Sequence, residues 1–156
     1  MTMKRRIIFV LFLILIVFSC SVACAGNNGG TQSMVTDKKI TFTIGERELS
    51  ASLVENAATE VLAERLETGP ITIEMNDYGG WEKVGSFGFS LPASNEQMTA
   101  QPCDFVLYQG NQLVIFYGSN SWSYTPLGRI DGVESAELKQ ILGSGDVTVT
   151  ISLAGD

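Results

Sequence analysis

Residues 104–118 decide the fold class, and they read Asp-Phe-Val-Leu-Tyr-Gln-Gly-Asn-Gln-Leu-Val-Ile-Phe-Tyr-Gly. Two apolar runs, Phe105–Gln109 and Gln112–Tyr117, flank the dipeptide Gly110-Asn111. This dipeptide suits a two-residue hairpin turn with glycine first, because glycine adopts a left-handed backbone at little cost. We therefore expect a pair of antiparallel strands at the centre of a mostly β domain.

Outward from this hairpin, apolar and polar residues alternate in further short segments, which predicts strands with one buried face. The expected strands cover residues 39–44, 49–53, 71–75 and 147–153. A short bent strand is expected over Val84–Leu91, where two glycines alternate with phenylalanines.

Two helices are expected among these strands. One follows Asn56, whose side chain can cap it, and ends before Gly69-Pro70. The other covers Ser135–Leu142 and ends at Gly143. Many short strands with glycine-rich turns favour a closed barrel of about eight strands, which leaves few free edges, with the two helices capping its ends.

The N-terminus is typical of an export signal. Three basic residues, Lys4–Arg6, precede an unbroken apolar run over Ile7–Phe18, and small residues follow. The run is shorter than the about 20 apolar residues that span a membrane. Ser21-Val22-Ala23-Cys24 resembles a lipoprotein cleavage motif, although Ser stands where Leu is preferred. We expect a lipoprotein signal peptide over residues 1–23 and lipidation of Cys24.

The expected product is exported and held in the bacterial cell envelope through its lipid anchor only. Lipidation at Cys20, secretion without lipidation and a retained signal anchor stay open as alternatives. Residues 24–37 are rich in small polar residues and predict a flexible tether, so the domain is expected over residues 38–156.

Charge excludes one class of partner. The chain has 10 lysines and arginines against 17 acids, and three of the basic residues leave with the signal peptide. The exported part therefore carries a formal charge of −10. A nucleic-acid binder needs a basic patch to neutralise phosphates, so we expect no nucleic-acid partner.

The chain contains no histidine. The commonest general base, the usual zinc sites and Ser-His or Cys-His nucleophile pairs are thereby excluded. We expect no bound metal and no cofactor, and we expect Cys103 to be a buried apolar filler. Asp77 and Glu82 could form an acid/base pair or bind a cation, but solvated loop charges are the expected state of both.

Aromatic and amide side chains gather in three segments and predict a binding surface for a peptide, a protein or a small organic ligand. Trp122 is the best single candidate for an exposed contact, because its polar neighbours provide no core face. The alternative is that the rings belong to the barrel core. The candidate ligand-binding residues are Asn76, Tyr78, Trp81, Gln109, Tyr117, Asn120, Trp122 and Tyr124.

Four segments together resemble the small bacterial cyclophilin-like fold family: residues 75–85, Leu91-Pro92, 104–112 and 115–118. The resemblance covers about residues 38–154 and implies a closed eight-stranded barrel with two capping helices. It implies no settled activity, although some members occur beside flavodoxin-like proteins, which makes such a redox protein a further possible partner. Fold alone does not transfer function.

Prolyl isomerases of related fold use an arginine followed by a Phe-Met-x-Gln pattern. The corresponding stretch here, Trp81–Leu91, has neither feature. A non-enzymatic binding module is therefore the leading expectation. A weak peptidyl-prolyl isomerase or folding factor is the alternative, and an accessory to a flavodoxin-like redox partner is a further one.

Overall fold

The computed structural model describes residues 35–155. The predicted signal peptide, Cys24 and most of the predicted tether lie outside the described residues. The described part contains nine strands and two helices. In chain order these are β1 (Val35–Ile44), β2 (Arg47–Val54), α1 (Ala57–Leu66), β3 (Ile71–Tyr78), β4 (Glu82–Ser86), β5 (Glu96–Ala100), β6 (Asp104–Tyr108), β7 (Gln112–Phe116), β8 (Asn120–Ile130), α2 (Ser135–Leu142) and β9 (Val147–Leu153).

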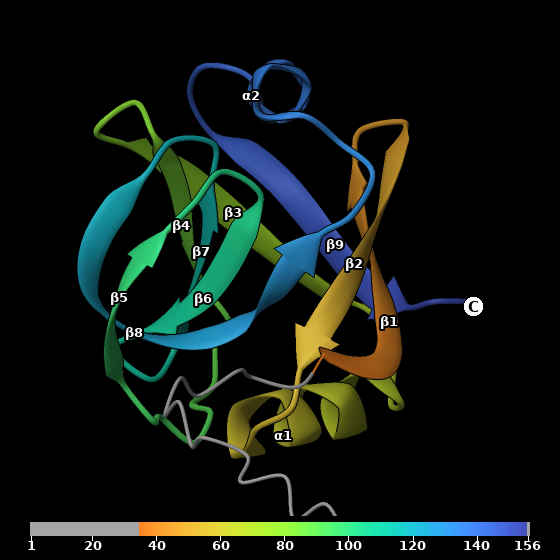
Figure 1. The fold of residues 1–156 in the computed structure, drawn as a ribbon. Helices are drawn as coiled ribbons and strands as arrows, with labels where there is room; N and C mark the ends of the chain where they lie inside the picture. The colour runs from red at the N-terminus through yellow and green to blue at the C-terminus, as the bar shows by residue number, and fades with distance from the viewer. Residues whose placement is uncertain (1–34, 156) are drawn as a thin grey trace, which may run out of the picture. The chain divides into compact units, whose positions relative to one another are not determined.

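Eight strands form a closed antiparallel ring. Their order is β2-β1-β9-β3-β4-β7-β6-β8, and the pairing of β8 with β2 closes it. Figure 1 shows α1 and α2 at opposite ends of this ring. The expected mostly β barrel of about eight strands with two capping helices is thus confirmed.

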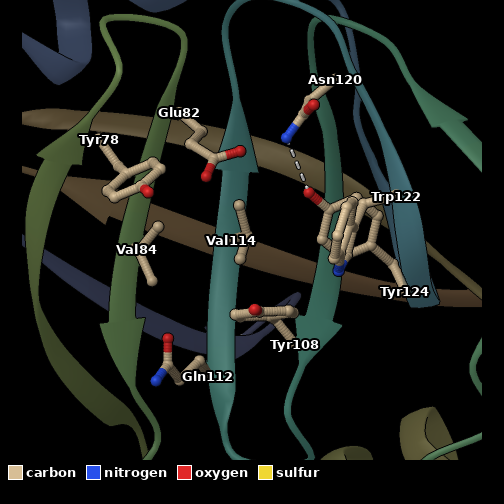
Figure 2. Close-up of a pocket in the computed structure, with 9 residues that line it drawn as sticks. All are labelled: Tyr78, Glu82, Val84, Tyr108, Gln112, Val114, Asn120, Trp122 and Tyr124. Carbon is tan, nitrogen blue, oxygen red and sulfur yellow. Dashed lines mark hydrogen bonds between the residues drawn. The ribbon is translucent and has the colours of Figure 1, made fainter.

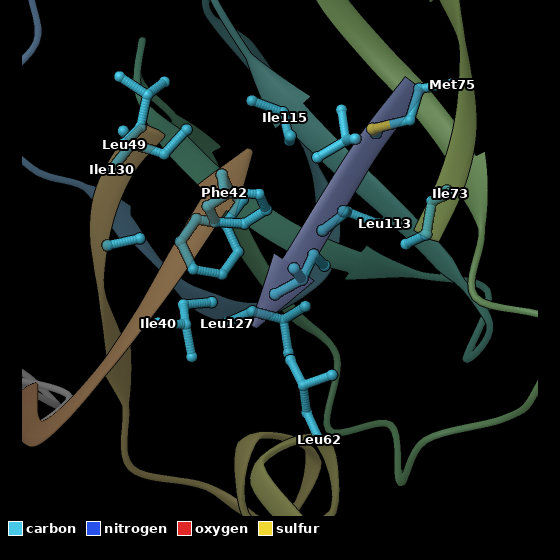
Figure 3. Packing of buried hydrophobic residues seen from close by; sticks show 14 of the residues in the cluster. Ile40, Phe42, Leu49, Leu62, Ile73, Met75, Leu113, Ile115, Leu127 and Ile130 are labelled. Atoms are coloured by element: carbon cyan, nitrogen blue, oxygen red, sulfur yellow. The ribbon is translucent and has the colours of Figure 1, made fainter. Parts of the chain in front are cut away.

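The barrel interior is a single apolar core. Each strand turns alternate side chains inward, and Phe42 of β1 meets Phe105 of β6 edge to face at 5.1 Å between ring centroids. Leu62 of α1 packs against this core (Figure 3), and Leu138 of α2 belongs to it as well. Burial of these side chains is the main stabilising contribution to the fold.

Helix α1 begins where the sequence predicts it. The Asn56 side chain accepts a hydrogen bond from the Thr59 N–H at 3.0 Å, and the Thr59 hydroxyl accepts one from the Asn56 N–H at 3.2 Å. Such a reciprocal pair satisfies two backbone donors that an uncapped helix would leave free. The expected N-cap is confirmed.

A second apolar cluster lies outside the barrel and explains the unbroken apolar runs of β6 and β7. On β7, Leu113 and Ile115 face the interior, whereas Val114 and Phe116 face this outer cluster. Strands that are buried on both faces lose the usual alternation of apolar and polar residues.

The first half of β8 extends beyond the ring and covers this outer cluster. Asn120–Tyr124 pairs with β5 rather than with a barrel strand, so β5 and this half of β8 form a two-stranded arm (Figure 1). Ala100 of β5 and Tyr124 of β8 pack into the outer cluster.

Some sequence expectations need correction. The strand expected over Val84–Leu91 ends at Ser86, and residues 87–95 are irregular. In the central hairpin the left-handed residues are Gln109 and Gly110, one position earlier than the expected Gly110-Asn111 pair. Strands β5 and β8 were not among the expected strands. In β8, Pro126 and Gly128 weaken the strand signal, and both lie where its register with β6 shifts.

Candidate functional site

A pocket of about 380 Å³ lies on the outer face of the barrel, between the β3–β4 hairpin and the arm of β8. We call it the outer-face pocket. Its volume is in the range of small-molecule sites. Figure 2 shows its lining residues, which are Tyr78, Glu82, Val84, Tyr108, Gln112, Val114, Asn120, Trp122 and Tyr124.

The β3–β4 hairpin provides one wall. Tyr78 of β3 lies opposite Glu82 of β4, and Asp77 lies opposite Lys83. Because neighbouring residues of a strand point to opposite faces, Tyr78 and Glu82 reach the outer-face pocket, while Asp77 and Lys83 turn toward the barrel end. The hairpin therefore places two polar groups on each face.

The arm of β8 provides the opposite wall. Asn120, Trp122 and Tyr124 alternate along the strand, so all three turn toward the pocket. The Asn120 amide donates a hydrogen bond to the Tyr124 hydroxyl at 3.0 Å. Trp122 is 58% exposed, and Tyr78 across the pocket is 64% exposed. Two large ring surfaces thus remain open to a ligand.

Packed aromatic rings hold the base of this wall in place. The Tyr124 ring meets Phe116 edge to face at 5.6 Å and Tyr108 at 5.9 Å between centroids. Phe116 itself is fully buried. These contacts fix the Tyr124 ring, and with it the hydrogen bond to Asn120, before any ligand enters.

Glu82 is the most unusual group of the pocket. Only 6% of the residue is exposed, and its Oε2 atom has no hydrogen-bond partner among the described residues. Burial raises the pKa of the Glu82 carboxyl above its ordinary value, and the nearby Asn120 amide offsets part of the rise. A buried polar atom without a partner costs stability, so its presence points to a ligand that completes it.

On the other face of the hairpin, Asp77, Lys83 and Tyr117 form a satisfied polar cluster. The fully buried Lys83 ammonium donates to Asp77 Oδ1 at 2.9 Å and to the Gly145 carbonyl at 2.5 Å. The Tyr117 hydroxyl also donates to Asp77. The hydrogen bonds from Tyr117 and Lys83 lower the pKa of Asp77, while burial and the Asp77 charge raise that of Tyr117. This cluster joins β3, β4, β7 and the loop before β9.

A model of the cyclophilin-like family matches residues 42–152, from β1 to β9. The chain belongs to the cyclophilin-like family. No curated protein matches it. The barrel and its two capping helices are therefore the family fold, and the resemblance noted in the sequence is confirmed.

The cyclophilin-like barrel brings four of the eight candidate residues together. Tyr78, Asn120, Trp122 and Tyr124 line the outer-face pocket. Asn76 lines a shallow groove that continues from it, because the groove shares Tyr78, Val84 and Gln112 with the pocket.

The other three candidates lie elsewhere. Trp81 packs its ring over Gly79 in the β3–β4 turn, and Gln109 is exposed in the β6–β7 turn. Tyr117 is buried in the polar cluster with Asp77. Their expected contact with a ligand remains untested, as does lipidation of Cys24, which lies outside the described residues.

Sequence reasoning missed five lining residues of the pocket. Glu82 was expected to be a solvated loop charge, and that expectation is wrong, because Glu82 belongs to β4 and is buried. Asp77 is solvent-exposed, as expected, but it belongs to β3 rather than to a loop and it pairs with Lys83. The alternation of side chains along a strand puts Glu82, Val84 and Ser86 on one face, and this pattern could have predicted that Glu82 lies beside Tyr78. The missed residues are Glu82, Val84, Tyr108, Gln112 and Val114.

The arginines of the cyclophilin-like domain are engaged away from the pocket. Arg47 pairs with Glu137 at 2.7 Å, and the Arg65 guanidinium lies 4.0 Å from the centroid of the Phe89 ring. Arg129 pairs with Asp104. No arginine of residues 35–155 lines the outer-face pocket.

Three further findings concern the described residues alone. No group of three or more Cys, Asp or Glu side chains within residues 35–155 is arranged to hold a metal ion. Neither α1 nor α2 is long and apolar enough to cross a membrane. Cys103 is 2% exposed and belongs to the barrel core, which confirms the expectation of a buried filler.

Proposed function

We propose that this cyclophilin-like domain is a binding module whose ligand occupies the outer-face pocket. The observation that carries the proposal is Glu82, a buried acid with an unpartnered oxygen in the wall of a pocket with exposed rings. A buried group that costs stability and keeps an atom without a partner among the described residues is the pattern expected of a functional site.

The shape of the site supports an organic ligand rather than a bare ion. Val84 and Val114 form an apolar floor, and Tyr78 and Trp122 offer ring surfaces on opposite walls. A few polar groups in an otherwise apolar pocket orient a ligand and provide specificity. A small organic molecule, or a side chain presented by a peptide or a protein partner, fits this description.

The proposal places the module in the cell envelope. Support comes from the basic, apolar and small-residue segments of residues 1–24, with Cys24 as the proposed lipid attachment site. Fractionation of cells that produce the chain, followed by mass spectrometry of its N-terminus, tests this. A free, unmodified Ala25 or Gly26 would favour plain secretion.

The two tryptophans provide a test of the binding site. Trp122 lines the pocket and Trp81 does not, so Trp122→Ala should remove most binding while Trp81→Phe should keep it. The assay is a ligand-observed NMR screen of small organic molecules and short peptides, Xaa-Pro peptides included. Equal binding by both variants would contradict the proposal.

The same screen separates binding from catalysis. Uncatalysed Xaa-Pro exchange takes about 10–100 s at room temperature, so catalysed exchange would be visible as new exchange peaks. Because no arginine of the described residues lines the pocket, we expect bound peptides to exchange at the uncatalysed rate. Acceleration that Trp122→Ala abolishes would replace the binding module with an isomerase.

A further inference from the structure

We infer that the ligand of the outer-face pocket presents an organic cation, an alkylammonium or guanidinium group, which binds between the Glu82 carboxylate and the rings of Tyr78 and Trp122. This inference rests on the proposed function and names its ligand class. Three independent features of the pocket carry it: the acid, the rings and the absence of a competing positive charge.

The acid supplies an acceptor that the protein does not use. Glu82 is 6% exposed and its Oε2 atom has no partner among the described residues. An N–H donor of a bound cation would satisfy this atom. A hydrogen bond between a cationic donor and a carboxylate is about twice as strong as one between neutral groups. It is stronger still where water is excluded.

The rings supply a surface that attracts positive charge. Tyr78 is 64% exposed and Trp122 is 58% exposed, on opposite walls (Figure 2). The face of an aromatic ring carries negative charge density, which attracts a cation that lies over it. Rings on both sides of an acid are therefore better suited to a cation than to an anion.

No lysine or arginine of residues 35–155 lines the pocket. The nearest lysine in sequence, Lys83, points to the other face of β4 and is bound to Asp77 and Gly145. An anionic ligand would meet Glu82 without compensation. The formal charge of −10 on residues 24–156 also raises the local concentration of cations.

The arrangement couples binding to a proton. The titratable groups that face Glu82 are phenols: Tyr78 of β3, Tyr108 of β6, and Tyr124 of β8, with Tyr117 beyond the end of β7. Burial raises the pKa of Glu82, and a bound cation would lower it again. Binding should therefore release protons and strengthen as the pH rises through the pKa of the free carboxyl.

Isothermal titration calorimetry of the full chain in a non-ionic detergent tests this inference. The probes are butylammonium against 1-butanol, and the peptide acetyl-Ala-Ala-Lys-Ala-Ala-amide against its Gln analogue. The amine pair reports a small free ligand and the peptide pair reports a side chain of a partner. Titration in two buffers with different ionisation enthalpies gives the protons released.

The expected result is that at least one cation binds about tenfold or more tightly than its neutral analogue, with proton release that is largest at and below the pKa of the free Glu82 carboxyl in a series of titrations at different pH. Glu82→Gln should weaken cation binding about tenfold to a hundredfold and abolish the proton release. Glu64→Gln removes the same charge from an exposed position of α1 and should change binding less than twofold.

Other outcomes overturn the inference and separate it from the proposed function. If neutral probes bind as tightly as cations, a cationic ligand is excluded. The same holds if Glu82→Gln keeps the affinity and a higher pH weakens binding, because Glu82 then acts as a neutral hydrogen-bond donor. The outer-face pocket then remains a binding site. If neither class of probe binds in a way that Trp122→Ala affects, the proposed function fails as well.

Discussion

At the scale of single residues, Glu82 shows how a site can oppose stability. Its carboxyl is enclosed by Tyr78, Asn120 and Tyr124, and no lysine or arginine of the described residues compensates it. Its neighbour Lys83 is equally buried, yet two acceptors satisfy its ammonium. The difference between these adjacent residues separates a group kept for a ligand from a group kept for the fold.

Replacing Glu82 with Leu should stabilise the protein. Since burial raises the pKa of the folded-state carboxyl above its ordinary 4.5, the acid favours folding at low pH and opposes it as the pH rises through the raised value. At pH 8 the variant should gain about 1–3 kcal/mol in the free energy of unfolding. The gain should shrink as the pH falls through the raised folded-state pKa and should be smallest below pH 4.5. Urea unfolding at several pH values measures this.

Val84→Ala is the matched control for this prediction. It deletes an apolar group from the same pocket wall and should lower the free energy of unfolding by about 1 kcal/mol at every pH. Should Glu82→Leu destabilise the protein at pH 8 as this control does, Glu82 would be an ordinary, well-satisfied residue of the fold.

At the scale of elements, the β3–β4 hairpin contributes both to the ligand site and to the stability of the fold. Its outer face carries Tyr78 and Glu82, and its inner face carries Asp77 and Lys83. The polar cluster of Asp77, Lys83 and Tyr117 holds the hairpin against the end of β7 and the loop before β9. A shift of one residue in the register would exchange the two pairs, so the buried ion pair also fixes the position of the ligand site.

Asp77→Asn should therefore destabilise the protein, because it leaves the buried Lys83 ammonium without a counter-charge. We expect a loss of about 3 kcal/mol at pH 7, the lower end for a broken buried pair, since Asp77 itself is 30% exposed. Hydrogen bonds from Tyr117 and Lys83 lower the pKa of Asp77 below its ordinary 3.8.

The pH dependence of this effect has a defined sign. The stabilisation by Asp77 is present above its unfolded-state pKa and is lost as the pH falls through the lowered folded-state value. Wild type and Asp77→Asn should therefore converge at strongly acidic pH in chemical unfolding. Glu48→Gln, an exposed change on β2, serves as the control. A difference in the free energy of unfolding that stays constant down to pH 2 would contradict this account of the polar cluster.

At the scale of the whole molecule, closure of the barrel depends on a close approach at Gly128. Where β8 meets β2, a Cβ added to Gly128 would lie 2.1 Å from the Ser52 carbonyl oxygen and 2.7 Å from the Phe105 ring. The pairing of β8 with β2 is what closes the ring. Only glycine lets the two backbones approach this closely.

Gly128→Ala should thus weaken the closing pair of strands and lower the free energy of unfolding by about 3 kcal/mol, the upper end for overpacking. Amide exchange should rise first at the seam between Ala51–Leu53 and Gly128–Ile130. Ser123→Ala, in the arm of the same strand, should leave the seam protected. Unchanged amide exchange in Gly128→Ala would show that the β2–β8 pair accommodates a Cβ atom without losing stability.

The sequence predicts the barrel well because its signals are local. Asn56 caps α1, Gly143 ends α2, and the hairpin over residues 104–117 is marked by its apolar runs and its glycine. Strand β8 is harder to predict, because Pro126 and Gly128 obscure the half that pairs with β6. Whether the first half of β8, Asn120–Tyr124, pairs with a barrel strand or with β5 depends on residues distant in sequence.

The candidate site is predictable only in part for the same reason. Tyr78 and Trp122 attract attention as large rings among polar neighbours, and the structure places both in the outer-face pocket. The burial of Glu82 depends on residues distant in sequence, Asn120 and Tyr124 of β8 among them, and no local pattern around Glu82 reveals them. Trp81 has a similar local sequence to Tyr78 but packs against its own turn instead.

The most direct test of the central claim is the titration of the Glu82 carboxyl carbon by ¹³C NMR, with and without butylammonium. The account predicts a pKa above the ordinary 4.5 in the free protein, and a lower pKa when the cation is bound. A Glu82 carboxyl that titrates at its ordinary value, and that butylammonium and the lysine peptide both leave unchanged, would contradict it.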